Sequence, residues 1–268
     1  HAHICSVMAE VGLDEKVIGV SFDGTGLGDD GNIWGGEFLI ADLEAFDRPV
    51  HLPYVPMPGG DKAVQEPWRM ALSFLYQLYG SNIFDLGVPC VDRRVGRETD
   101  IIIKSIDRGV NCPLTSSMGR LFDAVAAICG VCEQASFHAE APMRLEALVD
   151  TGIEDHYNYG YCNGSIILKE TFDHLLRDVR QRINLHRIAT KFHNTIVALT
   201  KAIILDLAET TGLSKVILSG GTFQNRYLLQ KLEDGLHGEG LEVFSNGKVP
   251  VNDGGIALGQ MVIAAKRR

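Results

Sequence analysis

VILSGGTFQNR, at residues 216–226, is the stretch that decides the fold. Its apolar run Val216–Leu218 is short and rich in β-branched residues, which is typical of a strand buried on both faces of a parallel sheet. The run leads to Gly220 and Gly221, where the missing Cβ atoms let a ligand approach the backbone closely. A helix that follows would direct its free N–H groups at the same space, which suits a phosphate. The pattern therefore predicts either an anion site or a plain tight strand-to-helix turn.

The composition is that of an ordinary globular chain, since 46% of the 268 residues are hydrophobic and 22% are charged. This length can bury a large core and suits either one big domain or two lobes. The formal net charge of −9 argues against a nucleic-acid partner, because phosphate contacts need clustered Lys and Arg. No apolar run reaches the roughly 20 residues of a membrane span and no signal-peptide pattern is present, so we expect a cytoplasmic protein.

Six cysteines are scattered through the chain, which favours reduced thiols in a chain large enough to fold without disulfides. Cys129 and Cys132 have the spacing of a metal or redox pair. They follow a helical run, however, and no second pair or histidine cluster accompanies them. We therefore expect core cysteines at a helix end.

Further strands and helices are expected around the glycine turn. Residues 16–22 predict a buried strand that ends at Asp23 among glycines, and Ile33–Ala41 predicts a second strand that forms a hairpin with it. Leu185–Thr211 has apolar residues at spacings of three and four, which predicts a long amphipathic helix packed on the sheet. We interpret His186 and His193 on this helix as a solvated or hydrogen-bonded pair without a functional role.

Two aspartates occupy corresponding places in the two halves of the chain. Asp23 follows the first strand, and Asp253 lies in a glycine-rich turn before a terminal helix expected over residues 256–265. In open α/β sheets, ligands bind at the carboxyl ends of the strands. This symmetry predicts an α/β protein with the two-lobed actin- and Hsp70-like (ASKHA) ATPase fold, in which a nucleotide lies between two related halves.

A metal site can be built from three distant residues, His3, Asp23 and Asp253. One imidazole and two carboxylates together suit a hard or borderline divalent ion. The alternative is that the aspartates cap turns or helices, as aspartates in glycine-rich turns usually do. A helix begins at His1 with no cap and no preceding strand, so we also expect residues upstream of this sequence.

Several phrases resemble the carboxyl-terminal portion of the HypF family, the carbamoyltransferases of nickel–iron hydrogenase maturation. In chain order these phrases are HAH, FDGTGLGDDGNIWGGEF, PMPGGDKAVQEPWRMAL, SSMGRLFDAVAAICGV, LSGGTFQNRYLL and VPVNDGGIALGQ. The resemblance covers essentially the whole chain. It implies the two-lobed fold with a metal in the cleft. Residues 1–110 would be the remainder of a first lobe, shortened at its N-terminus and carrying family insertions, and residues 111–268 would be the second lobe.

The resemblance also implies a set of site residues. A zinc or iron ion would be held by His3, Asp23 and Asp253, together with a first histidine two residues before His1. Catalytic roles would fall to His1 and His3, with His1 as an outer hydrogen-bond donor. ATP or carbamoyl adenylate would be held by residues of the glycine-rich turns and their neighbours, namely Gly24, Gly119, Asp123, Gly220, Gly221, Asn225, Gly254 and Gly255.

For the function, the resemblance implies one step in a series of reactions. An upstream domain of such proteins converts carbamoyl phosphate and ATP to carbamoyl adenylate. This region passes the carbamoyl group to the carboxyl-terminal cysteine thiolate of HypE, a step toward the cyanide ligands of the hydrogenase. The chain has no Ser-His-Asp or Cys-His pattern of its own for a nucleophile. Two alternatives stay open: an O-carbamoyltransferase acting on a small-molecule hydroxyl, and a nucleotide-binding interaction module without chemistry.

Overall fold

The computed structural model describes residues 1–268 and is a mixed α/β structure with one nine-stranded sheet. The strands are β1 (Val17–Leu27), β2 (Ile33–Ala41), β3 (Phe46–His51), β4 (Val55–Pro56), β5 (Leu114–Thr115), β6 (Gly160–Cys162), β7 (Ser165–Ile167), β8 (Lys215–Ser219) and β9 (Glu242–Ser245). The α-helices are α1 (Ala2–Val11), α2 (Lys62–Gln65), α3 (Pro67–Tyr79), α4 (Pro89–Asp92), α5 (Arg97–Arg108), α6 (Met118–Ile128), α7 (Glu140–Glu146), α8 (Lys169–Arg180), α9 (Leu185–Thr211), α10 (Arg226–His237) and α11 (Ile256–Lys266). Short 3-10 helices are η1 (Gly80–Asp85), η2 (Gly221–Gln224) and η3 (Asp253–Gly255). The predicted α/β class is confirmed.

The sheet is centred on β1, which pairs antiparallel with β2 and parallel with β8. Its long path runs in the order β6-β7-β3-β2-β1-β8-β9, while β5 pairs with β2 off this path and β4 pairs with β5. β8 also pairs parallel with β9, and its residues Val216, Ile217 and Leu218 are fully buried. The predictions of a buried parallel strand before the glycine pair and of a hairpin between the first two strands are therefore confirmed.

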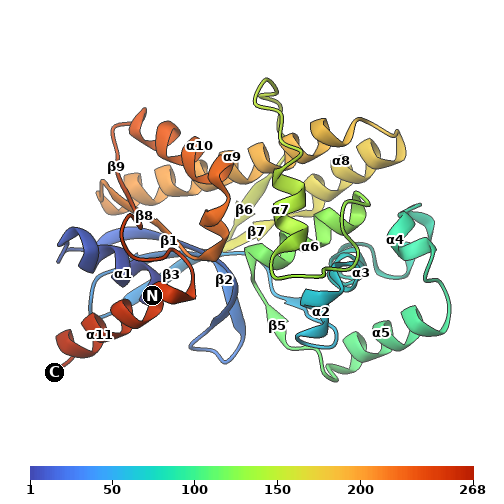
Figure 1. Ribbon diagram of the computed structural model, residues 1–268, viewed down its shortest axis with the longest axis horizontal. Helices are drawn as coiled ribbons and strands as arrows, with labels where there is room; N and C mark the ends of the chain where they lie inside the picture. Colours follow the sequence, from blue (N-terminus) through green and yellow to red (C-terminus); the bar gives the residue numbers. More distant parts are fainter.

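Helices cover both faces of the central strands (Figure 1). α1 and α11 lie together on one face, where Ile4, Val7 and Met8 of α1 form a small apolar cluster with Val17 and Ile217 of the sheet. α9 and α10 lie on the opposite face. A much larger cluster of 51 buried residues extends from that face into α3 and α6. The helices on the two faces of the sheet therefore pack on apolar cores of very different size.

The predicted long helix is present as α9, with the predicted bounds. Asn184 caps it, because the Asn184 side chain accepts a hydrogen bond from the His186 N–H at 2.8 Å. Gly212 ends it in the left-handed conformation, with a φ of 74° that glycine adopts without strain. Although α9 has 27 residues, neither it nor any other helix is both long and apolar enough to cross a membrane.

The sheet differs from the expectation in two respects. β1 does not end at Asp23 but continues to Leu27, because its pairing with β2 resumes at Gly26 after an irregular segment. Asp23 therefore lies inside a strand while Asp253 lies in η3, and the two positions are not equivalent. The expected boundary between residues 110 and 111 falls between α5 and β5, and strands from both sides of it belong to one sheet.

Candidate functional site

Three side chains from distant parts of the chain converge beyond the last paired residues of β1 and β8. His3 lies on α1, Asp23 in the irregular segment of β1, and Asp253 in η3. His3 Nε2 is 3.5 Å from Asp23 Oδ2 and 3.9 Å from Asp253 Oδ1. One ligand atom of each residue lies within 4.8 Å of the other two. The structure thus brings together the three residues that were expected to hold a metal, and His3, Asp23 and Asp253 form the candidate metal-ligand group.

The surroundings of His3 fit those of a metal ligand. The side chain of His3 is 9% exposed and that of Asp23 is 12% exposed, whereas that of Asp253 is 76% exposed. Neither ring nitrogen of His3 has a hydrogen-bond partner, although both are buried. A buried polar nitrogen without a partner is costly. A divalent ion held by one imidazole and two carboxylates would supply the missing partner for one of them.

The glycine pair after β8 holds Asp23. The Gly221 N–H donates a hydrogen bond to Asp23 Oδ1 at 3.2 Å. Burial raises the pKa of the Asp23 carboxyl, but His3 and the N–H groups of Gly24 and Gly221 together outweigh it, so the pKa lies below its ordinary value. A Cβ on Gly221 would lie 2.8 Å from Asp23 Oδ1, and Gly220 has a φ of 101°. Glycine at position 221 therefore lets the backbone approach the carboxylate of Asp23 itself, while Gly220 packs against the Phe22 backbone.

The turn that carries Asp253 is capped by its neighbour. Asn252 Oδ1 accepts a hydrogen bond from the Gly254 N–H at 3.1 Å, so the capping alternative is wrong for Asp253. A Cβ on Gly255 would lie 2.3 Å from the carbonyl oxygen of Pro250. Gly255 therefore allows this turn to close, and Asp253 is left with its carboxylate directed at His3.

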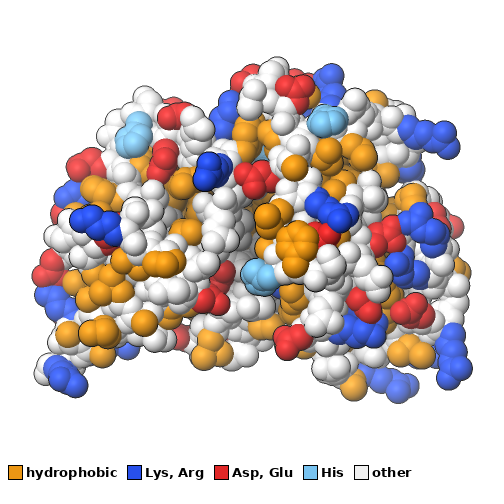
Figure 2. Space-filling model, viewed as in Figure 1, with side chains coloured by type: hydrophobic (Ala, Val, Ile, Leu, Met, Phe, Trp, Pro, Cys, Tyr) orange, Lys and Arg blue, Asp and Glu red, His pale blue; other side chains and the backbone are white.

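A cavity of about 240 Å³ adjoins Asp23 and Asp253. Its walls come from the irregular segment of β1, the start of α6, the glycine turn after β8, and α7 with the loop before it. A hollow in the middle of one face of the molecule has acidic side chains and a histidine at its edge (Figure 2). Of the residues expected to hold a nucleotide, four line the cavity, namely Gly24, Gly119, Gly221 and Asn225, whereas Asp123, Gly220, Gly254 and Gly255 do not.

Asn225 lines the cavity, but both ends of its amide are already bound. Its Oδ1 accepts a hydrogen bond from the Leu228 N–H at 3.0 Å and so caps α10. Its Nδ2 donates to Nε2 of His193 at 3.0 Å, and the Nδ1–H of His193 donates to the Ala189 carbonyl at 2.8 Å. Burial lowers the pKa of His193 to about 4. The neutral ring that this arrangement requires therefore persists at neutral pH, and the structural role expected for this histidine is confirmed.

A helix follows the glycine pair as expected, but several N–H groups at its start are already bound by carboxylates of the chain. The glycine pair leads into η2, and α10 begins only at Arg226. Oε1 of Glu146, at the end of α7, accepts hydrogen bonds from the N–H groups of Arg226 at 2.8 Å and Tyr227 at 3.4 Å. A carboxylate of the chain itself therefore occupies the place at this helix start where an anion was expected.

Sequence reasoning missed three ionisable residues of the cavity wall, Arg120, His138 and Glu146. Arg120 Nε lies 2.7 Å from Asp123 Oδ2, and both side chains are buried. Burial raises the pKa of the Asp123 carboxyl, and the Arg120 guanidinium opposes this rise. The spacing of three residues on one helix is a signal for such a pair. No comparable local signal marks His138 or Glu146, which reach the cavity through the loop before α7 and the end of that helix.

His1 lies close to the metal-ligand group, but its ring is turned away from His3, Asp23 and Asp253. Its Nε2–H donates a hydrogen bond to the Asp42 carbonyl at 2.7 Å, and its ring packs against Phe46 with 5.0 Å between the ring centroids. His1 lines a second, smaller cavity of about 190 Å³ together with His3 and Asp23. The His1 ring therefore has a backbone hydrogen-bond partner and makes no contact with the carboxylates of Asp23 and Asp253.

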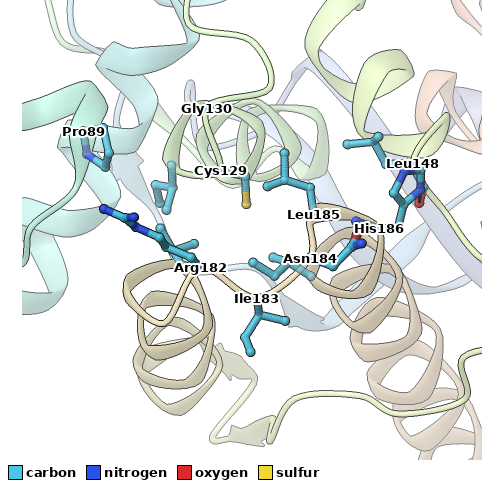
Figure 3. Close-up of a pocket in the computed structure, with 12 residues that line it drawn as sticks. Pro89, Cys129, Gly130, Leu148, Arg182, Ile183, Asn184, Leu185 and His186 are labelled. Carbon is cyan, nitrogen blue, oxygen red and sulfur yellow. Dashed lines mark hydrogen bonds between the residues drawn. The ribbon is translucent and has the colours of Figure 1, made fainter.

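A larger cavity, of about 600 Å³, lies elsewhere, at the turn between α8 and α9 (Figure 3). Cys129 at the end of α6 points into it, and Arg182 and His186 stand at its edge. None of the residues expected to bind metal or nucleotide lines it. Cys132 belongs to the apolar core, and no cysteine belongs to a group of side chains that could hold a metal. The expectation of core cysteines after this helix is confirmed for Cys132, whereas Cys129 is partly buried against the core and lines the cavity.

Comparisons with known proteins agree on one family. Residues 19–260 match the family model described as "Carbamoyltransferase, Kae1-like Domain, second subdomain". The carbamoyltransferase HypF2 of Cupriavidus necator is 36% identical over 299 residues, which cover 100% of this chain and 36% of that protein. A HypF homolog of the same organism is 36% identical over 285 residues, which cover 100% of this chain and 70% of that protein.

One solved structure is particularly similar, that of full-length HypF in the phosphate- and nucleotide-bound form. The TM-score is 0.94 at 46% sequence identity, and the match covers 99% of this chain and 42% of that one. The chain thus spans well under half of the length of this protein and of HypF2.

Proposed function

Because the chain belongs to the HypF family of carbamoyltransferases and corresponds to its Kae1-like region, we propose that it transfers a carbamoyl group from carbamoyl adenylate to a thiolate. The acceptor is the carboxyl-terminal cysteine of HypE, and the step belongs to nickel–iron hydrogenase maturation. The observation that carries the proposal is the convergence of His3, Asp23 and Asp253 beside a cavity with glycine in three of its walls.

The charges around the cavity support a bound cation. Among the residues that line it, Asp23, Glu146 and Asp253 are acidic, and Arg120 is the one arginine, with no lysine. An anionic nucleotide would be repelled by three carboxylates unless further positive charge were present. The buried and unpartnered Nε2 of His3 lies beside two of these carboxylates, and one imidazole with two carboxylates suits a zinc or iron ion.

The backbone of the cavity wall supports a nucleotide. A Cβ on Gly24 would meet only Arg120 Nη2, at 3.9 Å, so an adenylate can approach the backbone closely at Gly24. Gly119 and Gly221 also line the cavity, but a Cβ on either would meet Gly24 or Asp23 instead. The similar HypF structure is described as phosphate- and nucleotide-bound, which supports a nucleotide as a ligand of this region. Asn225 would shape the wall, because Leu228 and His193 hold both ends of its amide.

The residues of this chain would bind and orient the donor. When bound, the metal supplies Lewis-acid polarisation of the carbamoyl or phosphate oxygens. His3, Asp23 and Asp253 would hold it, and Gly221 fixes the Asp23 carboxylate by a backbone hydrogen bond. No serine or cysteine lines the cavity, which supports a nucleophile that arrives with the partner protein.

A transfer assay with three acceptors tests the proposal. The 268-residue chain, loaded with Zn²⁺ or Fe²⁺, is given carbamoyl adenylate together with HypE, with tRNA, or with a small-molecule alcohol, and each acceptor is examined by mass spectrometry. We expect carbamoyl on the terminal cysteine of HypE, and none when that cysteine is replaced by serine. Label on the alcohol alone would support an O-carbamoyltransferase. Nucleotide binding without transfer to any acceptor would support a binding module.

A further inference from the structure

Arg120 is a buried cation placed between two cavities. It is the third residue of α6, and its backbone N–H donates to the capping Ser117 Oγ at 3.2 Å. Its side chain is only 5% exposed. It lines the cavity beside the metal-ligand group and also a neighbouring cavity of about 420 Å³. The two cavities share Gly24, Thr25 and His138 as well, so Arg120 stands in the wall where they meet.

The guanidinium of Arg120 has few partners for a buried charge. Its Nε lies 2.7 Å from Asp123 Oδ2, but the two atoms lack the orientation of a hydrogen bond. Among the side-chain hydrogen bonds of the structure, none uses its two terminal amino groups. One of these groups, Nη2, lies 3.9 Å from the position that a Cβ on Gly24 would take. A buried charge is normally satisfied by several hydrogen bonds, so these donors point to a ligand.

The chemistry of the free donors selects an anion with several oxygens. A guanidinium presents its donors in a flat fork that matches phosphate better than a lysine ammonium does. No other arginine or lysine lines either cavity. Asp123, which was expected to touch the nucleotide, is buried against Arg120 instead and keeps the guanidinium in place.

We propose that Arg120 binds the phosphate of the adenylate and that Asp123 is its positioning residue. This inference rests on the proposed function, because it assumes the adenylate as donor. In the transfer, the thiol first loses its proton to water, and the sulfur then bonds to the carbamoyl carbon. The bond between that carbon and the phosphate oxygen breaks, and its electron pair leaves with AMP. Arg120 offsets the negative charge that develops on this oxygen.

Calorimetric binding of AMP and of adenosine to the 268-residue chain tests the inference. Arg120→Lys keeps a positive charge beside Asp123 but loses the fork, and the double variant Arg120→Met/Asp123→Asn removes both charges, so that no buried carboxylate is left unpaired. We expect AMP binding to weaken about tenfold or more in the double variant, which is about 1.4 kcal/mol or more, and less in Arg120→Lys. Adenosine binding should not change in either variant.

The matched control is Arg69→Lys. Arg69 is also buried and also pairs with a carboxylate three residues away, Glu66, but it lines neither cavity. This variant should bind both ligands as the parent does. Equal affinity for AMP in parent and both Arg120 variants would overturn the inference, and so would an equal loss for AMP and adenosine. A parent chain that binds neither ligand would overturn the nucleotide assignment of the proposed function, and the inference with it.

Discussion

Asp253 is the exposed member of the metal-ligand group. Because its side chain is exposed, its replacement should affect metal binding without affecting the stability of the fold. His3 and Asp23 are buried and held by the fold, whereas Asp253 makes no hydrogen bond within its own turn, which Asn252 caps. We expect Asp253→Asn to lower Zn²⁺ affinity about tenfold or more, because a neutral amide is a poorer ligand and removes one negative charge. Melting of the metal-free protein should stay within a few degrees of the parent.

Elemental analysis after loading with Zn²⁺, together with a thermal melt, checks this prediction. Asp85→Asn is the control, because Asp85 is an exposed carboxylate in η1 that belongs to no ion pair of the structure. It should keep the zinc content of the parent. Full zinc occupancy in Asp253→Asn would remove Asp253 from the ligand set.

The buried His193 should make the folded protein less stable in mild acid. Because its pKa is lowered from 6.5 to about 4 in the folded chain, the unfolded chain takes up a proton first as the pH falls. The free energy of unfolding should therefore decrease between pH 6.5 and 4, by up to about 3 kcal/mol from this group. Well above pH 6.5 the histidine is neutral in both states and contributes no pH dependence.

The variant His193→Gln isolates this contribution, because glutamine can still accept the hydrogen bond from Asn225 but does not titrate. Urea unfolding at a series of pH values should show a shallower decline in acid for the variant than for the parent. Parallel curves for the two proteins would contradict the assignment of the acid sensitivity to His193.

At the scale of elements, the packing of α1 on α11 decides whether His3 reaches the site. A Cβ on Gly259 of α11 would lie 1.9 Å from the carbonyl oxygen of Ala2, so the two helices touch backbone to backbone there. Gly259→Ala should force them apart, which costs about 1–3 kcal/mol and moves His3 away from Asp23. We expect lower thermal stability together with weaker Zn²⁺ binding.

The control is another glycine inside a helix. A Cβ on Gly235 of α10 would meet only the Lys201 side chain, at an ordinary 3.6 Å. Gly235→Ala should therefore stabilise the protein by about 0.5–1 kcal/mol through helix propensity and leave Zn²⁺ binding unchanged. An equal melting temperature for Gly259→Ala and Gly235→Ala would show that stability does not depend on the close approach of α1 and α11.

The elements that the sequence predicts well are those with a strong local period. α9 and β2 have the predicted bounds, and the apolar run of β8 is short and buried as expected. The extension of β1 beyond Asp23 was missed because its glycines break the alternation. The roles of Arg120 and Glu146 were missed for another reason. Glu146 contacts the start of α10, about 80 residues away in the chain, and no local pattern encodes such a contact. The pair of Arg120 and Asp123 has a local signal in its spacing of three residues, but that spacing does not show that Arg120 lines a cavity.

For the candidate site, residue types were easier to predict than environments. His3, Asp23 and Asp253 are brought together as expected. The glycines of the turn were assigned to the ligand alone, whereas Gly221 makes room for the Asp23 carboxylate. Asp123 was assigned to the nucleotide, whereas it is buried beside Arg120. Whether a carboxylate such as that of Asp123 faces a cavity or a neighbouring arginine depends on tertiary packing. A sequence motif does not encode that packing.

At the scale of the whole molecule, the two faces of the sheet have very unequal cores. The α9 face shares a cluster of 51 buried residues, whereas α1 is held by a cluster of eight. Glu10 of α1 also accepts hydrogen bonds from the N–H groups of Gly247, Lys248 and Val249, in the loop that leads to η3. The thin layer of α1, α11 and this loop carries His3 and Asp253, so we expect it to open more readily than the rest.

A metal ion shared by His3, Asp23 and Asp253 would tie this thin layer to β1, and amide hydrogen exchange can detect that tie. Without metal, amides of α1 and α11 should exchange faster than those of β1, β8 and α9. Zn²⁺ at about 100 times its dissociation constant adds about 2.7 kcal/mol to any opening that releases it, so exchange in α1 should slow about 100-fold at most. The central strands and α9 should change less, since the large apolar cluster already protects them.

In Asp253→Asn the same Zn²⁺ concentration should slow exchange in α1 far less. If α1 exchanged at one rate with and without Zn²⁺ in the parent protein, the three ligands would not share an ion.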